Sequence, residues 1–242
     1  MFNEQVKELK RHYRCISLDL RGQGDSEVTK SGYDMETVTD VTLALIKALD
    51  CAPCHFVGHA MGGFIGMRLA ADHPTMLRSL TLLDTSADAQ PPETKRRFRR
   101  LLYIGRVFSF RPLVKRILPI MFGQDFLQDE ARKDIREFWE KQFANNSPAG
   151  LSRASLSVMK REAMNNYLDK INVSTLIMVG EQDLITPVSH SHRMHEAIKD
   201  SELLVIADAG HSPTVENPQV VNHALRSFLQ STTQLQQQPG VA

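Results

Sequence analysis

Two segments of the sequence place proton-transferring residues directly after a short apolar run. Asp183 ends Gly180-Glu-Gln-Asp183, which follows the run Thr175–Gly180. His211 lies in Ala209-Gly-His-Ser-Pro213, which follows Leu203–Ile206. A histidine can act as a general base near neutral pH, and a carboxylate can orient its ring and stabilise its cation. We therefore predict that Asp183 and His211 act together as catalytic residues.

A third segment, Gly58-His-Ala-Met-Gly-Gly63, has the layout of a nucleophile elbow. In this layout a strand ends, glycines flank a sharp turn, and a helix begins. The turn normally carries the nucleophilic serine of G-x-S-x-G, but position 60 is alanine, and a methyl group cannot attack a carbonyl. The backbone N–H of Met61, at the start of the following helix, is the expected oxyanion donor.

The order along the chain is elbow, acid, base, and each segment follows a predicted strand. The carboxyl ends of parallel strands meet at one edge of a sheet, which is where such sheets bind ligands. We therefore expect Ala60, Asp183 and His211 to meet around one cavity. Asp84 ends the apolar run Ser79–Asp84 and is a rival for the acid, ranked lower because no comparable turn motif surrounds it.

Other candidate sites have weaker support. Among His190, His192 and His195, only the last two would share a helix face, and no cysteine or carboxylate completes a site, so we expect no metal. Cys51-Ala-Pro-Cys54 spells a C-x-x-C redox motif, but its position before an apolar run favours small buried hydrophobes. The glycine-rich segment 19–26 does not match a phosphate loop and is expected to be structural.

The elements that must position these residues alternate between strands and helices, which predicts an α/β fold with a mostly parallel central sheet. The predicted strands are Tyr13–Asp19, His55–Gly58, Ser79–Asp84, Thr175–Gly180 and Leu203–Ile206. The predicted helices include Met35–Leu49, Met61–Ala71, His192–Lys199 and a last helix capped by Asn217 with Pro218 at its first position. The continuous apolar character of the middle strands is typical of strands covered on both faces.

Residues 88–166 interrupt this alternation with helical sequence only, and we interpret them as a lid inserted into the core. The core then comprises residues 1–87 and 167–230, followed by a polar, glutamine-rich tail, residues 231–242, that we expect to be disordered. The first part of the lid is rich in arginine and lysine. Two interpretations stay open: a solvated helix face, which is favoured, or a surface that attracts carboxylate substrates.

The bulk properties exclude several classes of function. The chain has 242 residues and a formal net charge of +1, so no strong field favours nucleic acid or an anionic membrane. No apolar run approaches the roughly 20 residues that span a bilayer. Residues 1–5 lack the features of a secretory signal, so we expect a cytoplasmic protein with free thiols. The expected partner is a small-molecule substrate or ligand.

Four motifs together resemble the α/β-hydrolase fold family. They are Asp19-Leu-Arg-Gly-Gln-Gly-Asp-Ser26, Gly58-His-Ala-Met-Gly-Gly63, Gly180-Glu-Gln-Asp183 and Asp208-Ala-Gly-His211. The pattern is similar to small lid-bearing members such as 3-oxoadipate enol-lactonases and carboxylesterases. The elbow also resembles that of aminoacrylate hydrolases of pyrimidine breakdown, in which an alanine can occupy the nucleophile position. The resemblance implies hydrolysis of an ester, lactone or amide without a cofactor.

The resemblance also implies that the sheet is shortened at its N-terminal side. Family members have three strands before the helix that matches residues 2–10, and the loop after the third carries a second oxyanion donor. That third strand lies between the two strands that match Tyr13–Asp19 and His55–Gly58. Without it, those strands close up, another chain fills the slot, or the sequence is part of a longer hydrolase. Unsatisfied strand edges would favour a homo-oligomer.

Two functional hypotheses follow from the sequence. In the first, the chain is a hydrolase of a small ester, lactone or related carbonyl compound whose activity is weak or abolished by Ala60, whether that alanine is natural or engineered. In the second, it is a catalytically inactive pseudoenzyme or small-molecule binding module. Loss of the nucleophile and of the loop with the second oxyanion donor favours the second hypothesis, whereas retention of Asp183 and His211 argues mildly for the first.

Overall fold

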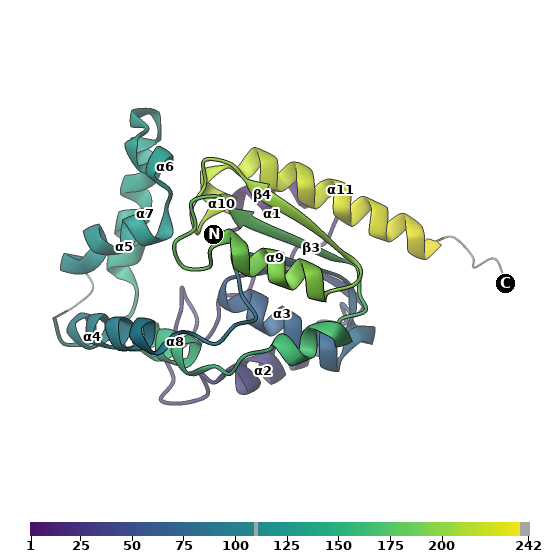
Figure 1. Ribbon diagram of the computed structural model, residues 1–242, viewed down its shortest axis with the longest axis horizontal. Coiled ribbons are helices and arrows are strands. Elements are labelled where there is room, and N and C mark those ends of the chain that lie inside the picture. Colours follow the sequence, from purple (N-terminus) through teal and green to yellow (C-terminus); the bar gives the residue numbers. More distant parts are fainter. Residues whose placement is uncertain (109–110, 238–242) are drawn as a thin grey trace.

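The computed structural model describes residues 1–108 and 111–237 and is built around one parallel sheet (Figure 1). The sheet has four strands in the order β1-β2-β3-β4, so each strand pairs with the next one along the chain. The strands are β1 (Cys54–His59), β2 (Leu77–Leu83), β3 (Thr175–Gly180) and β4 (Ser201–Ile206). They confirm four of the five strands predicted from the sequence, with small shifts of their ends.

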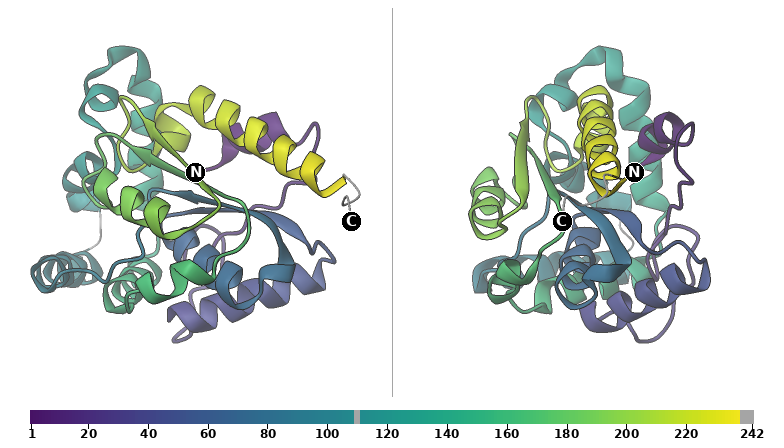
Figure 2. Two further views of the ribbon diagram at one scale, coloured as in Figure 1. Left: turned by 45° about the vertical axis from the view of Figure 1, so that its right-hand side comes forward. Right: turned by 90° about the vertical axis from the view of Figure 1, so that its right-hand side faces the viewer.

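Helices cover both faces of this sheet, as the apolar strands predicted. On one face, Leu82 of β2 and Ile177 of β3 pack with α2 (Met35–Ala48), α3 (Met61–Asp72) and α9 (Val188–Ala197). On the other face, Leu83 and Met178 pack with α1 (Asn3–Leu9) and α11 (Pro218–Gln237). Figure 2 shows α1 and α11 lying together over that second face. Every residue of β3 is buried, which explains its unbroken apolar sequence.

The predicted strand Tyr13–Asp19 is wrong, because the structure places this segment outside the sheet. It has no strand assignment, and Ile16 and Leu18 are 46% and 44% exposed. A segment becomes a strand only when a neighbour satisfies its backbone groups, and none of the described strands pairs with this one. The alternative in which this segment closes up against β1 is therefore also wrong.

Strand β1 lies at the edge of the sheet because the segment 13–19 does not pair with it. Within the described parts of the chain, β1 pairs with β2 alone, and most of its residues are only half-buried. A cavity of about 2000 Å³ is lined by β1, by the segment 13–20 and by Ala60, Met61 and His211. The space next to the free edge of β1 is thus continuous with the predicted site.

Residues 88–166 are helical as predicted, with no strand among those that the structure describes. Their helices are α4 (Pro92–Phe108), α5 (Val114–Met121), α6 (Gln124–Gln128), α7 (Lys133–Asn145) and α8 (Pro148–Lys160), with short 3-10 turns η2 (Arg111–Leu113) and η3 (Glu130–Arg132). Phe138, Trp139 and Leu151 from these helices line the cavity together with Ala60. This arrangement is consistent with a lid, although the domain boundaries themselves stay predictions.

The C-terminal tail differs from its prediction. Helix α11 continues to Gln237, past the expected end of the core at residue 230, and residues 238–242 lie outside the described part of the chain. The hydroxyl groups of Thr232 and Thr233 donate to the carbonyls of Phe228 and Leu229, one turn earlier. Glutamine also has a good helix propensity, so polar composition did not prevent this helix from continuing.

The remaining elements connect the layers. They are the 3-10 turns η1 (Pro74–Met76) and η4 (Asn165–Lys170), and the short helix α10 (Pro213–Glu216) that follows His211. Within the described residues, none of the helices combines the length and apolar character needed to cross a membrane.

A pair of leucine substitutions tests whether Tyr13–Asp19 lies outside the sheet. Leu82→Ala should lower the free energy of unfolding by about 2–5 kcal/mol, because Leu82 is fully buried in β2. Leu18→Ala should cost less than about 0.5 kcal/mol, because Leu18 is substantially exposed. Chemical denaturation of both variants measures the difference, and a loss for Leu18→Ala as large as that for Leu82→Ala would contradict the structure.

Candidate active site

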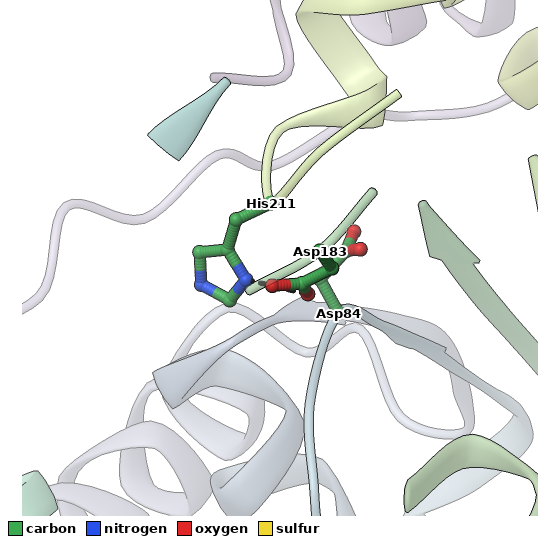
Figure 3. A group of neighbouring side chains, drawn as sticks. All are labelled: Asp84, Asp183 and His211. Carbon is green, nitrogen blue, oxygen red and sulfur yellow. Dashed lines mark hydrogen bonds and ion pairs between the residues drawn. The ribbon is translucent and has the colours of Figure 1, made fainter. Parts of the chain in front are cut away.

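The structure brings Asp183 and His211 together at the carboxyl edge of the sheet (Figure 3). Nδ1 of His211 lies 2.8 Å from Oδ2 of Asp183, and both side chains are buried. Asp183 lies on the turn after β3, and His211 lies on the loop between β4 and α10. Because Nδ1 donates to the carboxylate, Nε2 is the ring nitrogen left for proton transfer. The pairing predicted from the sequence is therefore present.

The surroundings of Asp183 keep its carboxylate ionised. Oδ1 accepts from the backbone N–H groups of Ile185 and Thr186 at 2.7 and 3.1 Å. Oδ2 accepts from the hydroxyl of Thr186 at 2.6 Å as well as from His211. Burial by itself would raise the pKa of Asp183, but hydrogen bonds from His211 and Thr186 outweigh it and hold that pKa below its ordinary range. The result is a fixed negative charge beside the imidazole.

The elbow has the strained backbone that its sequence predicts. Ala60 has φ of 47° and ψ of −105°, a region that non-glycine residues rarely occupy. Its N–H donates to the carbonyl of Leu83 at 2.9 Å, and its carbonyl accepts from the hydroxyl of Thr85 at 2.9 Å. The turn is thus anchored to the end of β2. Strain of this kind persists only where surrounding contacts fix the backbone.

His59 connects the elbow to the loop of His211. Its Nε2 lies 2.6 Å from the backbone carbonyl of His211, and the two ring centroids are 5.0 Å apart. A carbonyl can only accept, so Nε2 of His59 carries the hydrogen. Burial, followed by the neighbouring His211, lowers the pKa of His59 to about 3, which keeps this ring neutral. Ala60, Met61 and His211 line the same cavity, whereas Asp183, which is bonded to His211, is not among the residues that line it.

Glu216 is a second anchor that the sequence analysis missed. Its carboxylate accepts from the backbone N–H groups of Gly210 and Ser212 on either side of His211, and from that of Gly123 in the helical insertion. Glu216 lies on α10 and is only 2% exposed. The signal available in the sequence was an acidic residue one helical turn after Ser212. Its contacts connect the His211 loop to residues 88–166.

Asp84 lies beside the pair rather than replacing Asp183. One oxygen of Asp84, one of Asp183 and one ring nitrogen of His211 all lie within 4.8 Å of one another. His211 bonds Asp183, so the ranking of Asp183 above its rival agrees with the geometry. Among the described residues, this is the only group of three donors close enough together to hold a metal. The histidines at 190, 192 and 195 form no such group.

The remaining sequence motifs have mainly structural contacts. In segment 19–26, Gly22 and Gly24 have positive φ, and the hydroxyl of Ser26 donates to the carbonyl of Asp19 at 2.6 Å. Nε2 of Gln23 lies 3.5 Å from the sulfur of Met61 and so places this turn against the elbow. All three cysteines are free and half-buried. Burial raises the pKa of Cys54 to about 11, which disfavours the thiolate that redox chemistry requires.

A parallel sheet with an elbow and an acid–base pair at its carboxyl edge defines the class of α/β hydrolases. The family model described as alpha/beta hydrolase fold matches residues 1–218, and the chain belongs to this family. The sheet is shorter than that of the full fold.

This chain is similar to known proteins both in sequence and in solved structure. The AB hydrolase superfamily protein YisY of Bacillus subtilis is 29% identical over 235 residues, which cover 96% of this chain and 87% of YisY. A thermophilic esterase from Thermogutta terrifontis, solved with malate bound, has a TM-score of 0.88 and 28% identity, covering 96% of this chain and 85% of the esterase. The enol-lactonase of Burkholderia xenovorans LB400 has a TM-score of 0.87 and 25% identity, covering 95% and 85%.

Two glycines of the elbow provide a matched test of its geometry. A Cβ at Gly58 would lie 2.4 Å from backbone atoms of Gly62, so Gly58→Ala should lower the free energy of unfolding by about 1–3 kcal/mol. A Cβ at Gly62 meets no atom within 4 Å, so Gly62→Ala should be neutral or raise that free energy by up to about 1 kcal/mol. Thermal and chemical denaturation compare the two, and equal effects would show that the elbow is not folded this tightly.

Proposed function

We propose that this chain is a hydrolase for a small ester, lactone or related carbonyl compound, with activity limited by the alanine at position 60. The observation that carries the proposal is the 2.8 Å hydrogen bond between His211 and Asp183, on a loop that His59 connects directly to the elbow. This arrangement supports transfer of a proton at Nε2 of His211 beside the position that a nucleophile would occupy. The names of the similar esterase and enol-lactonase support the same substrate class.

With alanine at position 60, water is the nucleophile available for the proposed reaction. Nε2 of His211 would take a proton from water as it attacks the carbonyl carbon, while Asp183 stabilises the imidazolium that forms. The N–H of Met61 would stabilise the oxyanion, because the first amides of a helix have no carbonyl partner within it. The same proton on Nε2 would then pass to the leaving group, which completes hydrolysis.

The proposed activity is weak because position 60 has no hydroxyl to act as nucleophile. A serine hydrolase stripped of its triad retains roughly 10³–10⁴-fold catalysis over water, far below the intact enzyme.

Replacing alanine with serine tests the proposal directly. Ala60→Ser should raise kcat for short-chain p-nitrophenyl esters by at least about 10²-fold, because it places a hydroxyl in an elbow whose strained backbone is already formed. The measurement is steady-state release of p-nitrophenol by the wild-type chain and the variant.

Two further variants show whether any restored activity uses the proposed residues. In the Ala60→Ser background, His211→Ala should abolish the gain, and Asp183→Asn should lower kcat by up to about 10⁴-fold. Serine-dependent turnover that survives both changes would refute the assignment of His211 and Asp183.

A binding function without turnover is the second candidate, and the combination of Ala60 with a cavity of about 2000 Å³ favours it. In this case, neither the wild-type chain nor Ala60→Ser would hydrolyse esters, yet small carbonyl compounds would raise the melting temperature. At a ligand concentration 100 times Kd, the free energy of unfolding should rise by about 2.7 kcal/mol. Differential scanning fluorimetry with a panel of short-chain esters and lactones distinguishes the two functions.

A further inference from the structure

Asp84 is a buried acid that has no role in the proposed mechanism. It follows the last residue of β2, and its side chain is fully buried. Its φ of 44° lies in the left-handed region, although it is not a glycine. Its backbone N–H donates to the carbonyl of Met178 on β3 at 3.0 Å, which helps to fix this strained residue at the rim of the sheet. Figure 3 shows its carboxyl group next to Asp183 and His211.

The two neighbouring carboxyl groups have very different sets of donors. Asp183 accepts four hydrogen bonds, from Ile185, from the N–H and hydroxyl of Thr186, and from His211. Asp84 accepts one, from the N–H of Gly180 to Oδ1 at 2.9 Å. Among the described residues, Oδ2 of Asp84 is buried without a hydrogen-bond partner. The donors therefore stabilise a charge on Asp183 and leave little to stabilise one on Asp84.

We propose that Asp84 is a neutral carboxylic acid at pH 7, protonated on Oδ2 and turned toward Asp183, and that it acts as a positioning residue for the Asp183–His211 pair. The two acids then carry a single negative charge, which is held on Asp183 opposite His211. The protonation of Asp84 stands on the geometry alone, whereas its effect on catalysis rests on the proposed function.

The charged groups around Asp84 support this assignment. Asp183 on the turn after β3 and Glu216 on α10 are both acidic and both disfavour a further negative charge. His211 is already bonded to Asp183, His59 is neutral, and His190 on α9 bonds Ser86 at 2.8 Å. Burial, followed by the charge of Asp183, raises the pKa of Asp84 well above its ordinary value. A proton on Oδ2 of Asp84 removes the repulsion between the two acids. It also gives this otherwise unpaired oxygen a hydrogen that it can donate to Asp183.

The protonation of Asp84 makes stability depend on pH in a defined direction. In the unfolded chain, an aspartate loses its proton near pH 3.9, whereas folded Asp84 keeps it. The folded state then binds one more proton than the unfolded state, so Asp84 contributes stability at low pH that is lost as pH rises toward its folded pKa. Asparagine has no such proton and mimics the neutral acid, so Asp84→Asn removes this dependence.

The first experiment measures unfolding of the wild-type chain and Asp84→Asn between pH 5 and 8. The ratio of their unfolding constants, wild type over variant, should rise about tenfold for each pH unit. Asp169→Asn, a change at an exposed aspartate, should give a ratio that stays constant. A constant or falling ratio for Asp84→Asn would overturn the proposal, because it would mean that Asp84 is ionised in the folded protein.

A second experiment does not depend on a variant folding with native stability. Infrared difference spectra between the wild-type chain and Asp84→Asn at pH 7 should contain the C=O stretching band of a protonated carboxylic acid. If Asp84→Asn does not fold, the same band should be found in the wild-type spectrum and be lost on unfolding. A carboxylate band in place of the acid band would overturn the proposal.

The proposed effect of Asp84 on catalysis is tested in the Ala60→Ser background. Asp84→Ala should lower kcat about tenfold, the equivalent of one hydrogen bond, and should move the acid limb of the kcat–pH profile to higher pH, because Asp183 loses a donor and stabilises the imidazolium more strongly. Asp84→Asn should restore most of the kcat that Asp84→Ala loses.

If Asp84→Ala leaves the pH profile of kcat in place, Asp84 has no positioning role. If Ala60→Ser itself is inactive, the proposed function fails, whereas the stability and infrared experiments still decide the protonation of Asp84.

Discussion

The hydrogen bond between His211 and Asp183 is the interaction on which the arrangement of this site depends. It joins two loops that follow neighbouring strands, β3 and β4, and it does so in a buried place where an unpaired carboxylate would be very costly. The surrounding contacts all act on the same bond. Thr186 and Ile185 donate hydrogen bonds to the carboxylate, Glu216 holds the backbone on both sides of the histidine, and His59 connects the histidine to the elbow.

The elbow carries alanine at position 60, where the nucleophile-elbow layout normally has serine. Ala60 has a strained backbone conformation that an alanine side chain does not itself require. The contacts that enforce this strain come from Leu83 and Thr85 at the end of β2, so they persist independently of the side chain at position 60. The structure is therefore compatible with hydrolysis by activated water and with ligand binding alone, two functions that differ in whether His211 activates a water molecule beside the elbow.

Strand β1 is the edge strand of the sheet that lines the cavity. Central strands such as β3 are buried on both faces and paired on both edges, whereas β1 is paired on one edge and half-buried. The extended segment Tyr13–Asp19 and the free edge of β1 both line the large cavity that reaches the site. Local sequence made this segment resemble a strand, because β-branched and apolar residues favour extended backbone. Strand formation also requires a neighbour, and no local pattern can report whether one is present.

The sequence by itself determined the alternation of strands and helices, the family, and the pairing of Asp183 with His211, because periodicity, turn residues and motif order are local properties that a parallel sheet converts into proximity. It could also rank Asp183 above Asp84, since only Asp183 follows a recognisable turn. It could not find His59 or Glu216 as anchors, the pairing state of residues 13–19 or the continuation of α11 beyond residue 230. Those features, and the contrast in donors between Asp84 and Asp183, depend on which backbone and side-chain groups meet across long stretches of chain. Only the tertiary structure decides that, because burial and hydrogen bonding are properties of the packed molecule.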